Sequence, residues 1–152
     1  MRTTYRILAF IICGLVMLQA ASHAWASAGI AQYLAQGGTI DFASEGPPPF
    51  PEALGLMIHA MNGMYAIPVV ALLLLVVAFL AKIPGGVMRA VIVLVLVALQ
   101  VTLGILGHEL TALAFLHGVN ALALFGTALW AGMRAGRTDR QVPASRSSVG
   151  VA

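Results

Sequence analysis

Two apolar stretches of the chain carry the same polar pair, a histidine followed three residues later by an asparagine. His59 and Asn62 lie in LMIHAMNGMYAI, and His117 and Asn120 lie in AFLHGVNALALF. Ionisable or strongly polar side chains inside apolar spans are costly and usually face a protein interior, so a functional site is the first interpretation. A neutral imidazole can bind a metal through Nε2 while Nδ1–H donates to a partner. The two pairs are therefore candidate ligands.

A glutamine precedes each pair in a shared context. LVMLQ ends at Gln19 and LVALQ ends at Gln100, so the chain runs glutamine, His-x-x-Asn, glutamine, His-x-x-Asn. This order predicts a repeat of helical pairs. Each pair would cross a membrane and return, which makes the two copies parallel.

Small residues accompany the histidines. The position four residues after each histidine is Gly63 in the first copy and Ala121 in the second. It shares a helical face with the histidine and the asparagine. Gly118 directly follows the second histidine, and Gly104 lies four residues after the second glutamine. These positions would let a flat or bulky group approach the backbone, although small residues also serve helix packing.

Four long apolar runs would position these residues. Of the 152 residues, 61% are hydrophobic and 9% are charged, a composition of membrane proteins and not of soluble domains. The runs are continuous, too few to close a barrel, and about the 20 residues that a helix needs to cross the bilayer. We predict an all-α, four-helix transmembrane bundle made of two parallel helical-pair repeats, in one domain (1–134). The predicted spans are 7–25, 54–81, 87–106 and 111–133.

The basic and acidic residues are predicted to lie at opposite ends of the bundle. All eight basic residues would lie at one end of the bundle: Arg2, Arg6, Lys82, Arg89, Arg134, Arg137, Arg140 and Arg146. The connections at the other end carry only acidic charges: Asp41, Glu45, Glu52 and Glu109. The positive-inside rule predicts a plasma-membrane protein with both termini in the cytoplasm. The net charge of +3 is explained by the lipid bilayer as partner, without nucleic acid.

Counting along the spans predicts the depth of the polar residues. His59 is about five residues and His117 about six residues into its span, which places both roughly 8–9 Å below the outer ends of their helices. Gln19 and Gln100 lie near the outer ends of the other two helices. The polar side chains of all four helices should therefore meet in the outer half of the bundle.

The ends of the chain leave one alternative open. Arg2 and Arg6, the apolar run after them and Ala24-Trp25-Ala26 are also typical of a signal peptide cleaved after residue 26. A signal peptide has no reason to match Gln100 with a glutamine of its own, which favours a structural helix. The segment 135–152 is predicted to be a disordered cytoplasmic tail. Cys13 is the single cysteine and excludes a disulfide within the chain.

Two neutral imidazoles at equal depth on facing helices suit the axial ligation of heme b, which four-helix bundles hold between their helices. The alternative is that His59 and His117 only hydrogen-bond asparagine, glutamine or backbone and fix the helix register. A zinc ion would require a third ligand, and His23 and His108 are offset toward the outer surface. The sequence contains no phosphate loop, nucleophile elbow or carboxylate pair for acid–base catalysis.

Two stretches resemble the heme A synthase (heme O monooxygenase) family. LQVTLGILGHELTALAFLHGVNALALFGTALWAGMR is similar to its third and fourth helices, and FPEALGLMIHAMNGMYAIPVVALLLLVVAFL to its second. The resemblance covers about residues 50–134 and implies a four-helix bundle with His59 and His117 as axial heme ligands. The same outline fits short four-helix membrane proteins that look like one half of that synthase.

The chain also departs from that family. It has one bundle and one histidine pair where the synthase fuses two bundles, Ala60 replaces the arginine that often follows the ligand, and Glu52 lies seven positions before His59. Three hypotheses follow. The first is a heme b protein for electron transfer, heme handling or sensing, with a second copy or another membrane redox protein as partner. The second is a heme-free structural or accessory protein, and the third is a heme-modifying enzyme that acts as a dimer.

Overall fold

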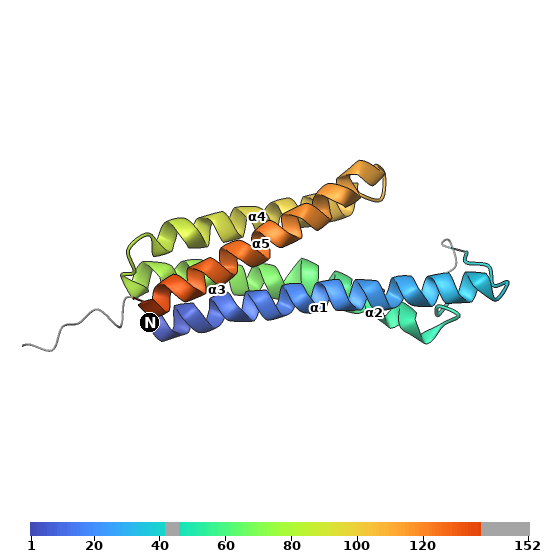
Figure 1. Ribbon diagram of the computed structural model, residues 1–152, viewed down its shortest axis with the longest axis horizontal. Coiled ribbons are helices and arrows are strands. Elements are labelled where there is room, and N and C mark those ends of the chain that lie inside the picture. Colours follow the sequence, from blue (N-terminus) through green and yellow to red (C-terminus); the bar gives the residue numbers. More distant parts are fainter. Residues whose placement is uncertain (42–45, 138–152) are drawn as a thin grey trace, which may run out of the picture.

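The computed structural model describes residues 1–41 and 46–137 of the chain. These residues form helices and connecting turns without a strand, which confirms the all-α prediction. The helices are α1 (Arg2–Ala35), a 3-10 turn (Pro51–Ala53), α2 (Leu54–Met61), a π-helical segment (Asn62–Ala66), α3 (Ile67–Ala81), α4 (Gly86–Leu106) and α5 (Thr111–Arg137). From Pro51 to Ala81 the helical segments follow one another directly and form the second span (Figure 1).

Four helices are long and apolar enough to cross a membrane, as predicted: Arg2–Ala35, Pro51–Ala81, Gly86–Leu106 and Thr111–Gly136. The chain is therefore a multi-pass membrane protein. Helix α1 continues ten residues past the predicted end of the first span, because no proline interrupts it before Gly37, where φ reaches 87°. Residues 135–137 belong to α5 and not to the predicted tail, since Ala135 is packed in the core. The rest of that tail lies outside the described residues.

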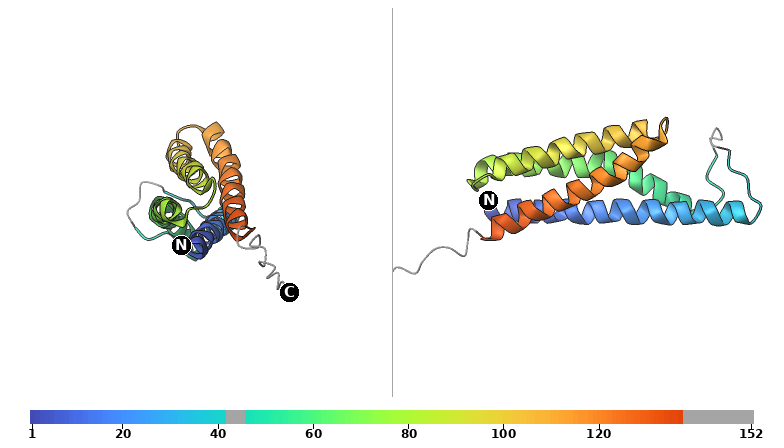
Figure 2. Two further views of the ribbon diagram at one scale, coloured as in Figure 1. Left: turned by 90° about the vertical axis from the view of Figure 1, so that its left-hand side faces the viewer. Right: turned by 45° about the horizontal axis from the view of Figure 1, so that its top comes forward.

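The helices form a ring in which α1 packs against α5 and the second span, while α4 packs against α5 and α3. As a result, α1 lies diagonally across from α4, and the second span lies diagonally across from α5 (Figure 2). This order places the two His-x-x-Asn helices on opposite corners of the bundle. Side chains that point inward from them can meet at the bundle axis.

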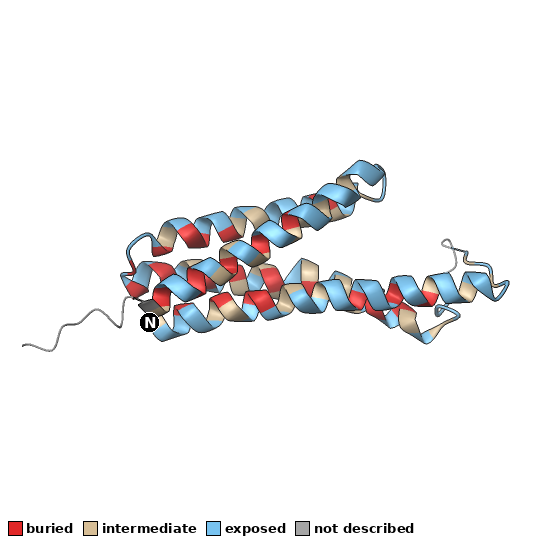
Figure 3. Cartoon of the chain, in the orientation of Figure 1, coloured by how far each residue is buried: buried red, intermediate tan, exposed pale blue. Residues whose placement is uncertain are grey.

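Small side chains close the bundle at the end that carries Arg6, Lys82, Arg89 and Arg134, here called the basic end. Fully buried alanines alternate there with larger apolar residues: Tyr5, Ala9, Ile12, Ala71, Leu74, Ala90, Val93, Leu124, Ala128 and Ala131. Alanine lets helix backbones approach closely inside a membrane. On α4 and α5 the buried positions concentrate in the half next to the basic end (Figure 3). Toward the opposite end, the α4–α5 pair diverges from α1 (Figure 1).

The α3–α4 turn is held to the rest of the bundle by polar side chains. Lys82 and Gly85 adopt positive φ angles of 50° and 65° and reverse the chain direction. The Tyr5 hydroxyl donates to the Gly86 carbonyl at 3.0 Å. Arg89 donates to the Pro84 carbonyl at 2.9 Å and lies 5.3 Å from the ring centre of Trp130. These contacts tie α1, α4 and α5 together, so helix divergence is confined to the other end.

Candidate functional site

The first His-x-x-Asn pair bonds directly to the glutamine of α1. Asn62 donates both Nδ2 hydrogens, to the Leu15 carbonyl at 2.9 Å and to Gln19 Oε1 at 3.0 Å. Nδ1 of His59 lies 3.1 Å from the backbone carbonyl oxygen of Gln19. We call Gln19, His59 and Asn62 the first cluster. It joins α1 to the second span.

The second pair makes the same bonds to the glutamine of α4. Asn120 donates to the Leu96 carbonyl at 2.9 Å and to Gln100 Oε1 at 2.6 Å, and His117 Nδ1 lies 3.0 Å from the Gln100 carbonyl oxygen. Gln100 Nε2 also donates to the His117 carbonyl at 3.0 Å. We call Gln100, His117 and Asn120 the second cluster. Each bond of the first cluster thus has a counterpart here, while a repeat of whole helical pairs stays a prediction.

These bonds define the tautomer of both histidines. A carbonyl oxygen can only accept a hydrogen bond, so Nδ1 of His59 and of His117 must carry the hydrogen. In a neutral ring the lone pair then lies on Nε2. Each cluster therefore holds an imidazole with Nε2 available as a metal ligand or a hydrogen-bond acceptor.

The two imidazoles face each other across the bundle axis. Their ring centres lie 6.1 Å apart with 49° between the ring planes, and both side chains are half-buried. A cavity of about 240 Å³ lies beside them, and both glutamines also line it. This volume falls slightly below the roughly 300–1,000 Å³ of typical ligand pockets.

Two glycines make room for the clusters. A Cβ atom on Gly63 would lie 2.5 Å from Gln19 Nε2, and a Cβ atom on Gly104 would lie 3.1 Å from Cε1 of His117. Gly63 was predicted as a site residue and lines the cavity. Gly118 was predicted as well, but it is exposed and a Cβ atom there would meet nothing within 4 Å. Gly104 supplies the space beside His117, and Gly118 does not.

The remaining predicted residues divide into two groups. Gln19, His59, Gln100 and His117 line the cavity. Asn62 and Asn120 are buried, with exposed fractions of 6% and 7%, and they hold the glutamines without lining the cavity. The backbone carbonyls of Leu15 and Leu96 complete the clusters, and no side-chain pattern could have indicated them.

Two more histidines lie close to the site. The ring of His23 meets that of His59 edge to face, with 5.0 Å between the ring centres. His108 lines the cavity. The spacing of four residues between Gln19 and His23 was the signal for the first of these contacts. Even so, no group of three or more His, Cys, Asp or Glu side chains within residues 1–41 and 46–137 is arranged to hold a metal ion.

The helix widens directly after His59. Asn62–Ala66 is π-helical and Pro68 follows in the first turn of α3. Proline has no N–H for the α-helical bond and its ring clashes with the carbonyl four residues earlier, so a local π segment accommodates it. The π segment therefore separates the His59 turn from the core-forming helix α3.

His59 and His117 would be the two protein ligands of a heme, since both rings are held by Nδ1 with Nε2 free of hydrogen and their centres lie 6.1 Å apart. A porphyrin supplies the four remaining ligands, so no third protein ligand is needed.

A comparison with protein-family models, curated proteins and solved structures found no match. The resemblance to heme A synthases therefore stays a prediction. Fold and site together define a class, namely a four-span membrane protein with two hydrogen-bonded Gln–His–Asn clusters that meet at one end.

Proposed function

We propose that the protein binds one heme b between His59 and His117. The observation that carries this proposal is the pair of imidazoles with Nε2 available and ring centres 6.1 Å apart. The Gln19 and Gln100 carbonyls orient both rings, as hydrogen-bond partners of metal-bound histidines do. When bound, heme would supply one-electron chemistry. The suggested roles are electron transfer, heme handling or sensing.

We also propose that the basic end lies in the cytoplasm and the histidine clusters near the outer face of the plasma membrane. Arg2, Arg6, Lys82, Arg89 and Arg134 all belong to the basic end. Glu52 lies at the opposite end of the bundle, in the first turn of the second span, and Glu109 lies there in the α4–α5 connection. Positive residues are retained on the cytoplasmic side during insertion, which supports this orientation.

The resemblance to one half of a heme A synthase supports the same assignment. It covers both histidine helices, and His59 and His117 take the positions of axial ligands in it. We infer a single-bundle relative of that family. A partner copy or another membrane redox protein would supply or accept electrons.

The test is the absorbance spectrum of the detergent-purified protein from a heme-replete host. We expect a Soret band and sharp bands in the reduced state, which His59→Gly and His117→Gly each abolish because a ligand is lost. Added imidazole should restore the bands in both variants. His23→Gly is the matched control and should keep the bands, since His23 contacts His59 but not the opposite ring. A colourless wild-type protein would contradict the proposal.

A heme-free structural role is the second candidate. It is favoured by the bonds themselves, because each cluster joins one helix to its neighbour through side-chain hydrogen bonds. In that case the clusters only fix register and depth. The folded but colourless protein would be the expected observation.

A further inference from the structure

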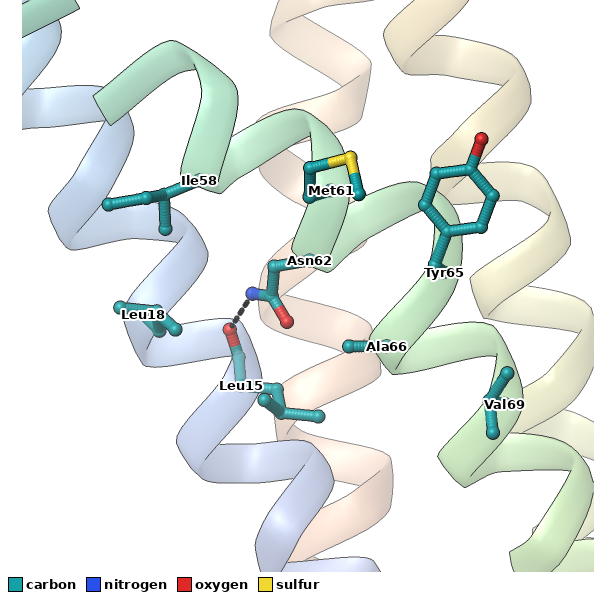
Figure 4. Close-up of a pocket in the computed structure, with 8 residues that line it drawn as sticks. All are labelled: Leu15, Leu18, Ile58, Met61, Asn62, Tyr65, Ala66 and Val69. Carbon is teal, nitrogen blue, oxygen red and sulfur yellow. Dashed lines mark hydrogen bonds between the residues drawn. The ribbon is translucent and has the colours of Figure 1, made fainter. Parts of the chain in front are cut away.

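A second hollow lies on the surface of the bundle between α1 and the π segment. It is lined by Asn62 and seven apolar or aromatic residues: Leu15, Leu18, Ile58, Met61, Tyr65, Ala66 and Val69 (Figure 4). It is shallow and wide open to the surroundings of the bundle, with a volume of about 570 Å³. We call it the α1–π groove. It shares no lining residue with the cavity beside the histidines.

The groove contains one buried polar atom whose hydrogen bond is missing. Asn62 is 6% exposed, and its Oδ1 has no partner among the described residues. Both Nδ2 hydrogens are used by the Leu15 carbonyl and Gln19 Oε1. Exchanging the amide nitrogen and oxygen would aim the oxygen at two acceptors, so the unpaired atom is the oxygen. The site therefore calls for a ligand that donates a hydrogen.

The surroundings indicate the rest of that ligand. Oδ1 points toward the space between Leu15 and Ala66, and Met61 and Tyr65 flank the groove (Figure 4). A thioether and a phenol ring favour contact with an aromatic ring. Leu15, Leu18 and Val69 offer only apolar surface, which suits a hydrocarbon tail in the bilayer. An aromatic ring with a hydroxyl group and an apolar tail is the chemistry of an isoprenoid quinol.

We propose that the α1–π groove binds a membrane quinol, with one quinol hydroxyl donating to Oδ1 of Asn62. Oδ1 is covered in the structure, so this bond requires a neighbouring groove side chain to move aside when the quinol binds. The quinone form lacks the O–H group and would leave Oδ1 unpaired. This selectivity involves no redox step, so the proposal holds whether or not heme is bound.

The full chain in nanodiscs is incubated with a short-tailed quinol, its quinone or its dimethyl ether, and retained ligand is quantified after gel filtration. We expect the quinol to bind about tenfold more tightly than the other two, the value of one net hydrogen bond. The dimethyl ether has no hydroxyl hydrogen, so it tests the hydrogen bond to Asn62 Oδ1 without a change to the protein. Equal retention of all three ligands would overturn the proposal.

A matched pair of variants tests the location. Val69 lines the groove and is 54% exposed, whereas Val76 is 57% exposed on the same helix and lies outside the groove. Val69→Trp should abolish quinol retention because it fills the groove, and Val76→Trp should leave it unchanged. If Val69→Trp keeps full quinol binding, or if both variants lose it equally, the quinol does not bind in this groove.

Discussion

At the scale of single residues, the two clusters show how polar side chains are accommodated within apolar helices. Leu15 and Gln19 offer carbonyl oxygens that already accept helical N–H bonds, and each also accepts a hydrogen from Asn62 or His59. The two Nδ2 hydrogens of Asn62 therefore need only one side-chain acceptor, Gln19 Oε1. Asn120 likewise donates its two Nδ2 hydrogens to the Leu96 carbonyl and to Gln100 Oε1. The residue types are costly in lipid, and these bonds offset that cost.

Gln100→Leu tests the strength of a cluster. The change removes the acceptor of Asn120 at 2.6 Å and the donor to the His117 carbonyl. Hydrogen bonds between membrane helices contribute about 0.6 kcal/mol each on average, so we expect a loss of roughly 1–2 kcal/mol in unfolding free energy. Thermal unfolding in detergent measures it.

Thr102→Val is the matched control on the same helix. The Thr102 hydroxyl is exposed and bonds only within α4, to the Ala98 carbonyl. Its loss should change the melting temperature little. Equal melting temperatures for wild type and Gln100→Leu would show that the second cluster does not stabilise the bundle.

At the scale of elements, close contact between α1 and the second span brings the first cluster into register. Gly55 lies against the Ser22 carbonyl and Ala26, and Gly29 lies against the side chain of Glu52. A glycine lets two backbones approach where any side chain would separate them. Since Gly55 lies one turn before His59, this contact also determines how close His59 comes to the Gln19 carbonyl.

Gly55→Ala should therefore destabilise the protein. A Cβ atom at Gly55 would collide with the Ser22 backbone, which cannot move aside as a flexible side chain can. Overpacking of this kind costs about 1–3 kcal/mol, more than the gain of up to about 1 kcal/mol in helix propensity. Gly118→Ala provides the control, because nothing lies within 4 Å and only the propensity gain remains. A melting temperature that rises in both variants would refute the close contact at Gly55.

At the scale of the whole molecule, the two ends of the bundle differ. The basic end is closed by buried alanines and by the contacts of Tyr5 and Arg89. At the histidine end, α4 and α5 diverge from α1, which leaves the cavity between the clusters (Figure 1). A packed end can hold the helices in a defined geometry while the other end stays open enough for a ligand.

Cysteine labelling in intact cells tests the proposed orientation. In a Cys13→Ala background, an impermeant maleimide should label Leu110→Cys, which is exposed in the α4–α5 connection. Pro84→Cys, exposed in the α3–α4 turn, should react only after permeabilisation because it lies at the basic end. The opposite pattern would invert the topology.

The sequence by itself determined the four spans and the two recurring polar pairs, because hydropathy and helical spacing are local properties. Only the tertiary structure decided which atoms meet. Helix packing placed Asn62 and Asn120 behind the glutamines, left Gly118 facing outward and brought His23 beside His59. The spacing of residues along one helix predicts the face on which each side chain lies. The distance across the axis depends on how close two backbones come, and that is settled by contacts such as Gly55 against Ser22.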